Sequence, residues 1–252
     1  MSPLLIAALC LTMVGTAFLS GIFGMAGGMI LVGILLALLP LPEAMMLHGV
    51  TQMASNGWRA LLWWRYVRWS AVTSYLLGCA AALLLWSLWR YVPSKPVALL
   101  LLGLTPFLAR LAPANYRPNP DSVRQGTFYG AACMTLILLT GVSGPLIDTF
   151  FLGGKFDRRE IVATKAMCQV VGHGAKLVYF GSLIDQAASV DPIVAVLAIV
   201  SSMIGTTLAR QVLEAMSDQQ YRKWANGIIV AIAGYYVIHG TALMAMTHIS
   251  VR

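Results

Sequence analysis

Ten apolar runs, separated by short polar segments, extend along nearly the whole chain. A helix needs about 20 apolar residues to cross the ~30 Å hydrocarbon core of a bilayer. Most of the runs approach that length, so the pattern predicts membrane-spanning helices joined by short loops. The runs fall near residues 4–20, 29–39, 45–64, 70–89, 96–111, 126–140, 145–153, 161–182, 192–209 and 224–246.

Two of the runs, 29–39 and 145–153, are too short to cross a bilayer as helices. Each follows a glycine break, with the sequence GIFGMAGG at 21–28 and GVSGP at 141–145. A shift of the chain by 120 residues places the first two glycines of one break onto those of the other. In both halves, the broken unit is followed by a helix with a polar stripe and then by two plain helices.

This repetition predicts an all-α polytopic membrane protein of two inverted repeats, each a glycine-broken helical hairpin followed by three transmembrane helices. The first repeat covers 1–111 and the second 124–246, with a linker at 112–123 and a C-terminal tail at 247–252. If each broken unit returns to the side it entered, one repeat holds three crossings, and an odd number inverts the second repeat. The sequence leaves open whether the breaks are hairpins or kinked crossings.

The loop charges favour the inverted arrangement, with both chain termini outside. The loops that are then predicted inside hold 11 of the 17 Lys and Arg residues, as the positive-inside rule requires. If the broken units crossed fully, the basic loops would fall on both faces. These residues are Arg65, Arg68, Arg110, Arg117, Arg124, Lys155, Arg158, Arg159, Arg210, Arg222 and Lys223.

The composition excludes several classes of protein. Hydrophobic residues make up 59% of the chain and charged residues 10%, whereas an average soluble domain is about a quarter charged. A soluble domain, a disordered chain and a secreted disulfide scaffold are therefore excluded. The net charge is +8, and most Lys and Arg residues lie between apolar runs. This position indicates topogenic charge and not binding to nucleic acid. The four cysteines lie within apolar runs without a CxxC pair, so we expect neither disulfides nor a metal or cofactor site.

A polar stripe marks the helix predicted at 45–64. Along one face of this otherwise apolar segment lie His48, Gln52, Asn56 and Arg59. A charged side chain at the centre of a span costs roughly 2.5–3.5 kcal/mol on insertion scales, so it usually has a function. We predict that Gln52, Asn56 and Arg59 line a substrate cavity. Topogenic charge is the alternative for Arg59, and His48, near the helix start, is interpreted as a core residue.

The helix predicted at 161–182 carries a counterpart stripe, formed by Lys165, Gln169, His173 and Lys176. His173 and Lys176 lie deepest in the run, which favours a cavity lining over a structural role. Lys165 lies nearer the inside end of its helix, and a topogenic role is its alternative. We predict that all four residues contact the substrate.

The glycine breaks are candidates for backbone contacts with a ligand. A helix that begins within the membrane presents unpaired N–H groups and a partial positive charge, which suit an anion. We predict that Gly24, Gly27, Gly28 and Gly144 approach the substrate. Tight packing between helices is the alternative, because small residues also serve that purpose.

Asp148 is the only acidic residue inside an apolar run. Together with His173 it is a candidate for proton coupling, because intramembrane ionisable residues often form proton relays. A structural role is the alternative, either as an ion pair with Lys165 or Lys176 or as a helix cap.

Several short motifs follow one another along the chain. They are GIFGMAGG at 21–28 ahead of Leu41-Pro42, Gly49-Val-Thr-Gln52 with Ser55-Asn56, Gly141-Val-Ser-Gly144, and Ala163-Thr-Lys165. In this order and spacing the chain resembles the sulfite exporter TauE/SafE family of bacterial permeases. The resemblance implies transport, mostly outward, of small sulfur-containing anions such as sulfite or short organosulfonates. The first break reads GMAGG in place of a run of three glycines, and Pro145 stands where a further glycine is often found.

The residues and the resemblance together predict a secondary transporter of the bacterial inner membrane, not an enzyme. We expect a small anion and the lipid bilayer as partners, with alternating access between the two repeats. A passive anion channel and a carrier of another small organic anion are the alternatives. HExxH, GxSxG and Walker A motifs are absent from the sequence, and Cys168 and His173 lack the spacing that would place them on one helix face. The oligomeric state is left open, a homodimer included.

Overall fold

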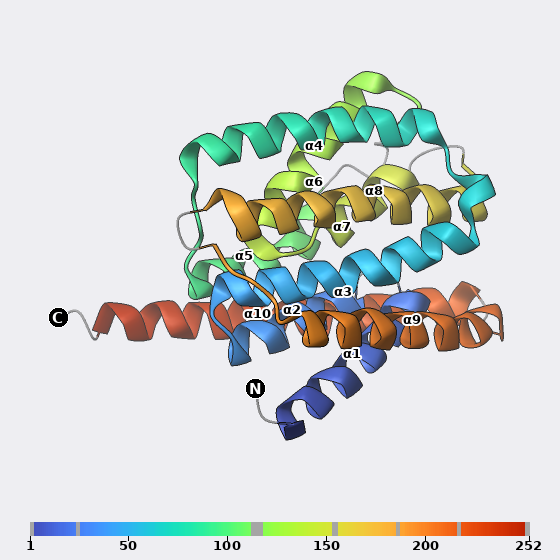
Figure 1. Cartoon of the computed structure of the whole chain (residues 1–252). Helices are drawn as coiled ribbons and strands as arrows, with labels where there is room; N and C mark the ends of the chain where they lie inside the picture. The colour runs from blue at the N-terminus through green and yellow to red at the C-terminus, as the bar shows by residue number, and fades with distance from the viewer. Residues whose placement is uncertain are drawn as a thin grey trace.

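The protein is built from α-helices. The computed structural model describes residues 3–23, 26–111, 118–152, 156–184, 187–215 and 218–249, and these contain no β-strand. The first half holds α1 (Pro3–Phe23), α2 (Ala26–Leu38), α3 (Leu41–Leu62), the 3-10 turn η1 (Trp64–Tyr66), α4 (Trp69–Trp89) and α5 (Lys95–Arg110) (Figure 1). The second half holds α6 (Val123–Thr140), α7 (Gly144–Leu152), α8 (Arg158–Val178), the π-helical turn η2 (Tyr179–Leu183), α9 (Pro192–Ala215) and α10 (Asp218–Ile249).

Each of the ten apolar runs corresponds to one α-helix, so the predicted helices are confirmed, with ends that shift by several residues at most. Local sequence explains two of the ends. α6 stops at Gly141, whose φ of 87° is left-handed, a conformation that glycine adopts without strain. α8 begins at a capping box, in which the Asp157 carboxylate accepts from the Glu160 N–H and the Glu160 carboxylate accepts from the Asp157 N–H.

Four helices in the described part of the chain are long and apolar enough to cross a membrane. They are Pro3–Phe23, Trp69–Trp89, Pro192–Val212 and Gly227–Met246. Ala26–Leu38 and Lys95–Leu108 are apolar but shorter. α3 and α8 are also long, but their polar stripes make them less apolar. The chain is therefore a multi-pass membrane protein, and the number of complete crossings stays a prediction.

The helices with polar stripes, α3 and α8, lie side by side in the middle of the molecule. α4 packs against α8 and α9 packs against α3, so the stripes are enclosed on both sides (Figure 1). The two central helices run antiparallel, because Gly49 near the start of α3 faces Leu177 near the end of α8, whereas Gly57 faces Val170. The beginning of one stripe therefore meets the end of the other.

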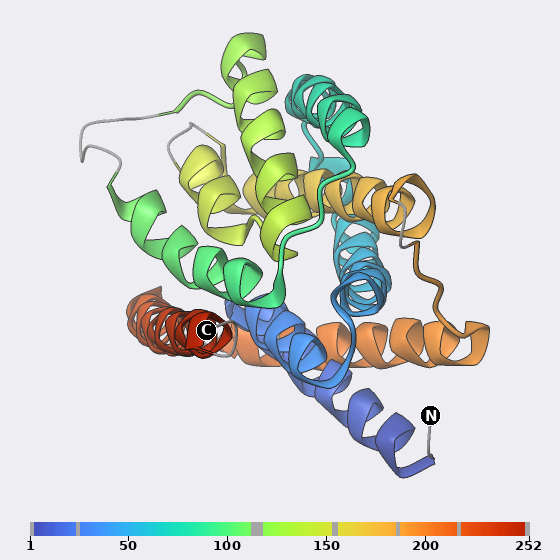
Figure 2. The same cartoon turned by 90° about the vertical axis from the view of Figure 1, so that its left-hand side faces the viewer.

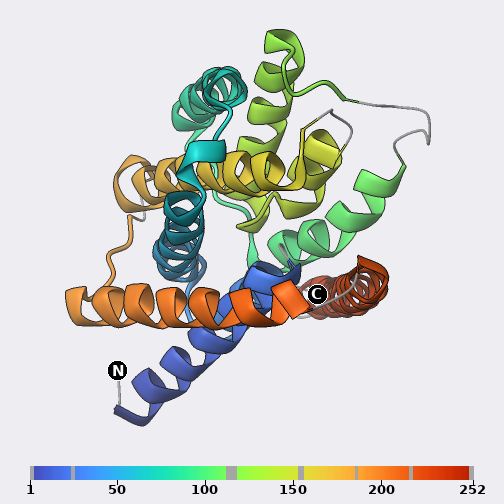
Figure 3. The ribbon, with the colours of Figure 1, turned by 90° about the vertical axis from the view of Figure 1, so that its right-hand side faces the viewer.

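Three further helix pairs surround this centre. α1 crosses α9, α6 packs against α4, and α5 packs against α10 (Figures 2 and 3). Two of the crossings depend on glycine: a Cβ on Gly205 of α9 would overlap the Val14 carbonyl oxygen, and a Cβ on Gly78 of α4 would overlap that of Thr127. Small residues bring helix backbones together where lipid supplies no hydrophobic driving force.

The outer surface of the bundle is apolar, as a lipid-facing surface must be. Large exposed side chains occur on α4, α9 and α10, among them Leu77, Leu84, Leu88, Ile193, Val196, Leu208, Tyr235 and Ile238. The short helix α7 is instead held inside the bundle, since the Phe150 ring stacks on Tyr129 of α6 with centroids 4.4 Å apart. This packing fixes the second glycine break close to α8.

Candidate functional site

Lys176, in the last turn of α8, is completely buried, with 0% of the residue exposed. Its Nζ atom lies 2.7 Å from Nδ1 of His48 and 3.3 Å from the carbonyl oxygen of Gly141. No carboxylate of the described residues forms an ion pair with Lys176. An amino group without a counter-charge is thus enclosed between α3, α8 and the second glycine break.

His48 of α3 continues this contact toward the first glycine break. Its Nε2 atom lies 3.0 Å from the carbonyl oxygen of Gly28, at the start of α2. A carbonyl oxygen only accepts, so Nε2 carries the hydrogen and the Nδ1 lone pair accepts from Lys176. One chain of hydrogen bonds therefore links both glycine breaks through the two central helices.

His173, one turn before Lys176, packs against His48. The two rings meet edge to face, with centroids 5.5 Å apart and an interplanar angle of 74°. His173 is 2% exposed, and its Nδ1 atom has no hydrogen-bond partner among the described residues. We call Lys176, His48, His173 and the carbonyl groups of Gly28 and Gly141 the central cluster. It combines buried donors with a ring nitrogen that no described residue uses.

Gln52 lies one turn after His48 and faces the start of α2. A Cβ placed on Gly28 would lie 3.2 Å from the Gln52 side-chain oxygen, so the glycine lets the amide approach the α2 backbone closely. Gln52 is buried. Of these two predicted site residues, Gly28 thus belongs to the central cluster and Gln52 lies beside it.

Asn56 and Arg59 lie farther along α3 than Gln52. They lie near the end of α1, the helix that precedes the first break. Arg59 donates to the Asn56 side-chain oxygen at 3.3 Å and to the Ser20 carbonyl oxygen near the end of α1 at 3.1 Å. Asn56 in turn donates to the Gln52 carbonyl oxygen at 2.9 Å. Arg59 thus binds protein backbone inside the bundle, about 16 Å along the helix axis from His48.

Lys165 occupies a different environment from Lys176. Its Nζ atom pairs with the Asp148 carboxylate of α7 at 2.5 Å, and the two side chains are 15% and 21% exposed. Of the roles considered for Asp148, the ion pair with Lys165 is therefore observed. Gln169, between the two lysines, is half-buried. The stripe on α8 has one compensated end and one uncompensated end.

The four glycines predicted to contact the substrate through their backbone have different surroundings. Gly24 lies outside the described residues, and Gly144 is the buried first residue of α7. A Cβ on Gly27 would overlap the Thr16 carbonyl oxygen, so this glycine permits close packing of α2 on α1. Among the predicted glycines that the structure describes, Gly28 is the one that joins the central cluster.

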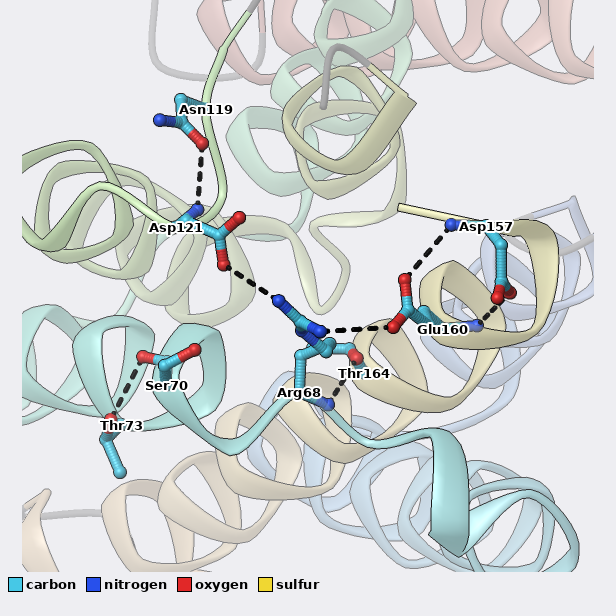
Figure 4. A network of polar contacts seen from close by, with 8 residues as sticks. All are labelled: Arg68, Ser70, Thr73, Asn119, Asp121, Asp157, Glu160 and Thr164. Carbon is cyan, nitrogen blue, oxygen red and sulfur yellow. Dashed lines mark hydrogen bonds and ion pairs between the residues drawn. The ribbon is translucent and has the colours of Figure 1, made fainter. Parts of the chain in front are cut away.

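A second polar network lies at the ends of α4, α6 and α8 (Figure 4). The Arg68 guanidinium reaches Glu160 at 3.3 Å and Asp121 at 3.7 Å, and its backbone N–H donates to the Thr164 hydroxyl at 3.0 Å. The Arg68 and Asp121 side chains are 47% and 48% exposed. Exposed pairs of this kind contribute little stability, and the network joins the ends of three helices.

His48 and Gly141 are missing from the predicted binding residues. His48 is nevertheless the first member of the α3 stripe, and Gly141 opens the second break. What brings them into the site is the antiparallel pairing of α3 and α8, which places the start of one stripe at the end of the other. That pairing depends on tertiary packing and is not visible in the periodicity of either helix.

Comparison with known proteins agrees with this architecture. A family model described as sulfite exporter TauE/SafE matches residues 8–236, which include both breaks, both stripes and the central cluster. Searches of curated proteins and of solved structures found no match. The family consists of transporters and not enzymes, and it implies a membrane transporter of sulfite-like anions. The chain belongs to the sulfite exporter TauE/SafE family.

Proposed function

We propose that this protein is a secondary transporter that exports a small sulfur-containing oxyanion, such as sulfite or a short organosulfonate, across the inner membrane. The observation that carries the proposal is the buried Lys176, which binds His48 and Gly141 but no described carboxylate. The substrate supplies the missing negative charge. Lys176 is therefore the principal binding residue, supported by His173 and Gln52.

The chemistry of the central cluster suits an oxyanion. An ammonium group buried without a partner is strongly disfavoured, whereas a charge-assisted hydrogen bond to an anionic oxygen is short and strong. A sulfite or sulfonate group has several acceptor oxygens and can engage more than one donor. Donors near the site are the Lys176 amino group, the Gln52 amide and, in its Nδ1–H tautomer, the ring of His173.

The arrangement of helix pairs supports inverted repeats as the basis of alternating access. The helices α1 to α5 of the first half correspond in order to α6 to α10 of the second half. When each helix is replaced by its counterpart, α1 becomes α6 and α9 becomes α4. The α1–α9 pair then becomes α6–α4, and the α3–α8 and α5–α10 pairs become themselves. We propose that the repeats of 1–111 and 124–246 rock about the central pair, with both termini outside as the loop charges suggest.

The remaining predicted lining residues take supporting roles in this proposal. Asn56 and Arg59 shape the path toward the first break, and Gly144 presents the start of α7. Lys165 and Asp148 neutralise each other. We therefore propose that they line the path of the substrate without binding it. Proton coupling is part of the proposal, with His173 and Asp148 as candidate residues for it.

Transport by the purified protein in liposomes tests the function. We expect saturable uptake of labelled sulfite and of methanesulfonate, with accumulation above the external concentration when a pH gradient is imposed. Uptake that never exceeds equilibration would favour a passive channel. Absence of flux for both anions, by a protein that is folded and inserted, would contradict the proposed substrate class.

A further inference from the structure

Among the described residues, Lys176 has hydrogen-bond partners for a neutral amine but not for an ammonium. Two acceptors of the described residues lie within reach of Nζ, His48 Nδ1 at 2.7 Å and the Gly141 carbonyl oxygen at 3.3 Å. A neutral amine has two N–H groups, and these two acceptors satisfy both. An ammonium has three N–H groups and a full charge, so it needs one more acceptor and a counter-charge.

His48 cannot take up the positive charge of Lys176 in this arrangement. Its Nε2–H is committed to the Gly28 carbonyl oxygen, and its Nδ1 lone pair accepts from Lys176. A proton on Nδ1 would replace the acceptor by a donor and leave the two groups in repulsion. His48 therefore holds the Lys176 amino group in place and leaves its third bonding direction for the substrate.

We propose that Lys176 is the proton carrier of the transporter, and that a proton and the anion bind to it together. This inference rests on the proposed function. In the free protein the Lys176 side chain is the neutral amine. When the anion arrives, Nζ takes one proton from solution, and the resulting ammonium donates its third hydrogen bond to an anion oxygen. Proton and anion leave together, so the amine is restored.

The charge balance of this step has a consequence for transport. One positive and one negative charge enter the central cluster together, so its net charge does not change for a monovalent anion. The loaded carrier then reorients without moving net charge through the membrane. An anion bound without a proton would instead meet a neutral amine, which offers no counter-charge.

The other titratable groups packed around α8 are occupied elsewhere. α2 contributes no titratable side chain. Asp148 of α7 is paired with Lys165. Tyr75 and Cys79 of α4 and Cys133 of α6 form a separate group with Cys168, and Tyr179 of η2 donates to the Tyr91 carbonyl oxygen. Among the described residues, His48 binds Lys176 and His173 packs against His48, so His173 is the competing candidate for the proton.

Calorimetry on the purified full chain tests the proposal, with methanesulfonate as the probe. This anion remains ionised at every pH used, so any proton taken up on binding goes to the protein. Titrations in buffers of different ionisation enthalpy give the number of protons bound per anion. We expect about one near pH 7, with affinity falling about tenfold for each pH unit above neutrality. Binding without proton uptake would overturn the inference and leave the proposed function intact.

Two variants decide which residue carries the proton. Lys176→Arg keeps a permanent positive charge, so we expect methanesulfonate to bind without proton uptake and with little pH dependence. The matched control is Asp121→Asn, in the exposed network at the helix ends, which should keep one proton per anion. Full proton uptake in Lys176→Arg would assign the proton to His173 or Asp148 and overturn the inference.

The wild-type titration needs no variant, so the proposal remains testable if Lys176→Arg does not fold. A wild-type affinity that is independent of pH contradicts joint binding directly. If neither methanesulfonate nor sulfite binds to the folded wild-type protein, the proposed function fails and the inference fails with it. Failure of the inference alone is recognised by tight anion binding without a proton.

Discussion

Two lysines on one face of α8 have opposite environments. Lys165 is partly exposed and paired with Asp148, whereas Lys176 is completely buried and, among the described residues, binds a histidine and a carbonyl oxygen. They lie about 16 Å apart along the helix axis. The polar stripe is therefore not a uniform cavity lining: the paired Lys165 has a structural partner, whereas the Lys176 amino group has no carboxylate partner among the described residues.

The largest effect is expected from removing the Lys176 amino group. Lys176→Met should weaken binding of methanesulfonate at least about tenfold, because a charge-assisted hydrogen bond contributes roughly 1.5–3 kcal/mol. The matched control is the double variant Asp148→Asn with Lys165→Met, which should change affinity less than about threefold. Equal losses in the two proteins, measured by calorimetry, would show that both ends of α8 bind the anion.

Breaking the compensated pair from one side should affect stability more than binding. Asp148→Asn leaves Lys165 partly buried without its partner, and we expect a loss of about 1–3 kcal/mol in the free energy of unfolding. The double variant with Lys165→Met should recover most of this loss. Thermal unfolding in detergent measures both, and a single variant as stable as wild type would mean that the pair has no structural role.

Much of this fold could be predicted from the sequence, because lipid imposes simple rules on length and polarity. The ten apolar runs locate the helices, and the glycines at 21–28 and 141–145 locate the breaks. The site was predicted less completely. The stripes predict Gln52, His173 and Lys176 as site residues, and the structure brings these three near one another. The contacts of His48 with Lys176 and of Lys165 with Asp148 depend on which helix ends meet in space.

A smaller effect is expected where the α2 backbone approaches Gln52. A methyl group on Gly28 would lie 3.2 Å from the Gln52 oxygen, so Gly28→Ala should shift the amide and lower affinity about two- to fivefold, a loss near 0.5–1 kcal/mol. The control is Gly57→Ala, where the nearest atom, Val170 Cγ2, would be 3.8 Å away. The control should bind as wild type does, and an equal loss in both would point to a general effect on α3.

The smallest effect is expected from the exposed network at the helix ends. Asp121→Asn removes one ion pair of Arg68, whose partners lie 3.7 Å apart and are about half exposed. Such pairs contribute about 0–1 kcal/mol, so we expect little change in thermal unfolding and none in anion affinity. A large loss of transport in this variant would indicate that the network controls access to the site.

The location of the bound anion tests the central claim most directly. Selenite resembles sulfite and carries an atom that scatters X-rays anomalously, so crystals of the protein grown with selenite reveal its position. We expect an anomalous peak within hydrogen-bond distance of the Lys176 amino group, beside His173 and Gln52. A peak at Lys165 or Arg59, with none near Lys176, would contradict the claim that the uncompensated lysine holds the substrate.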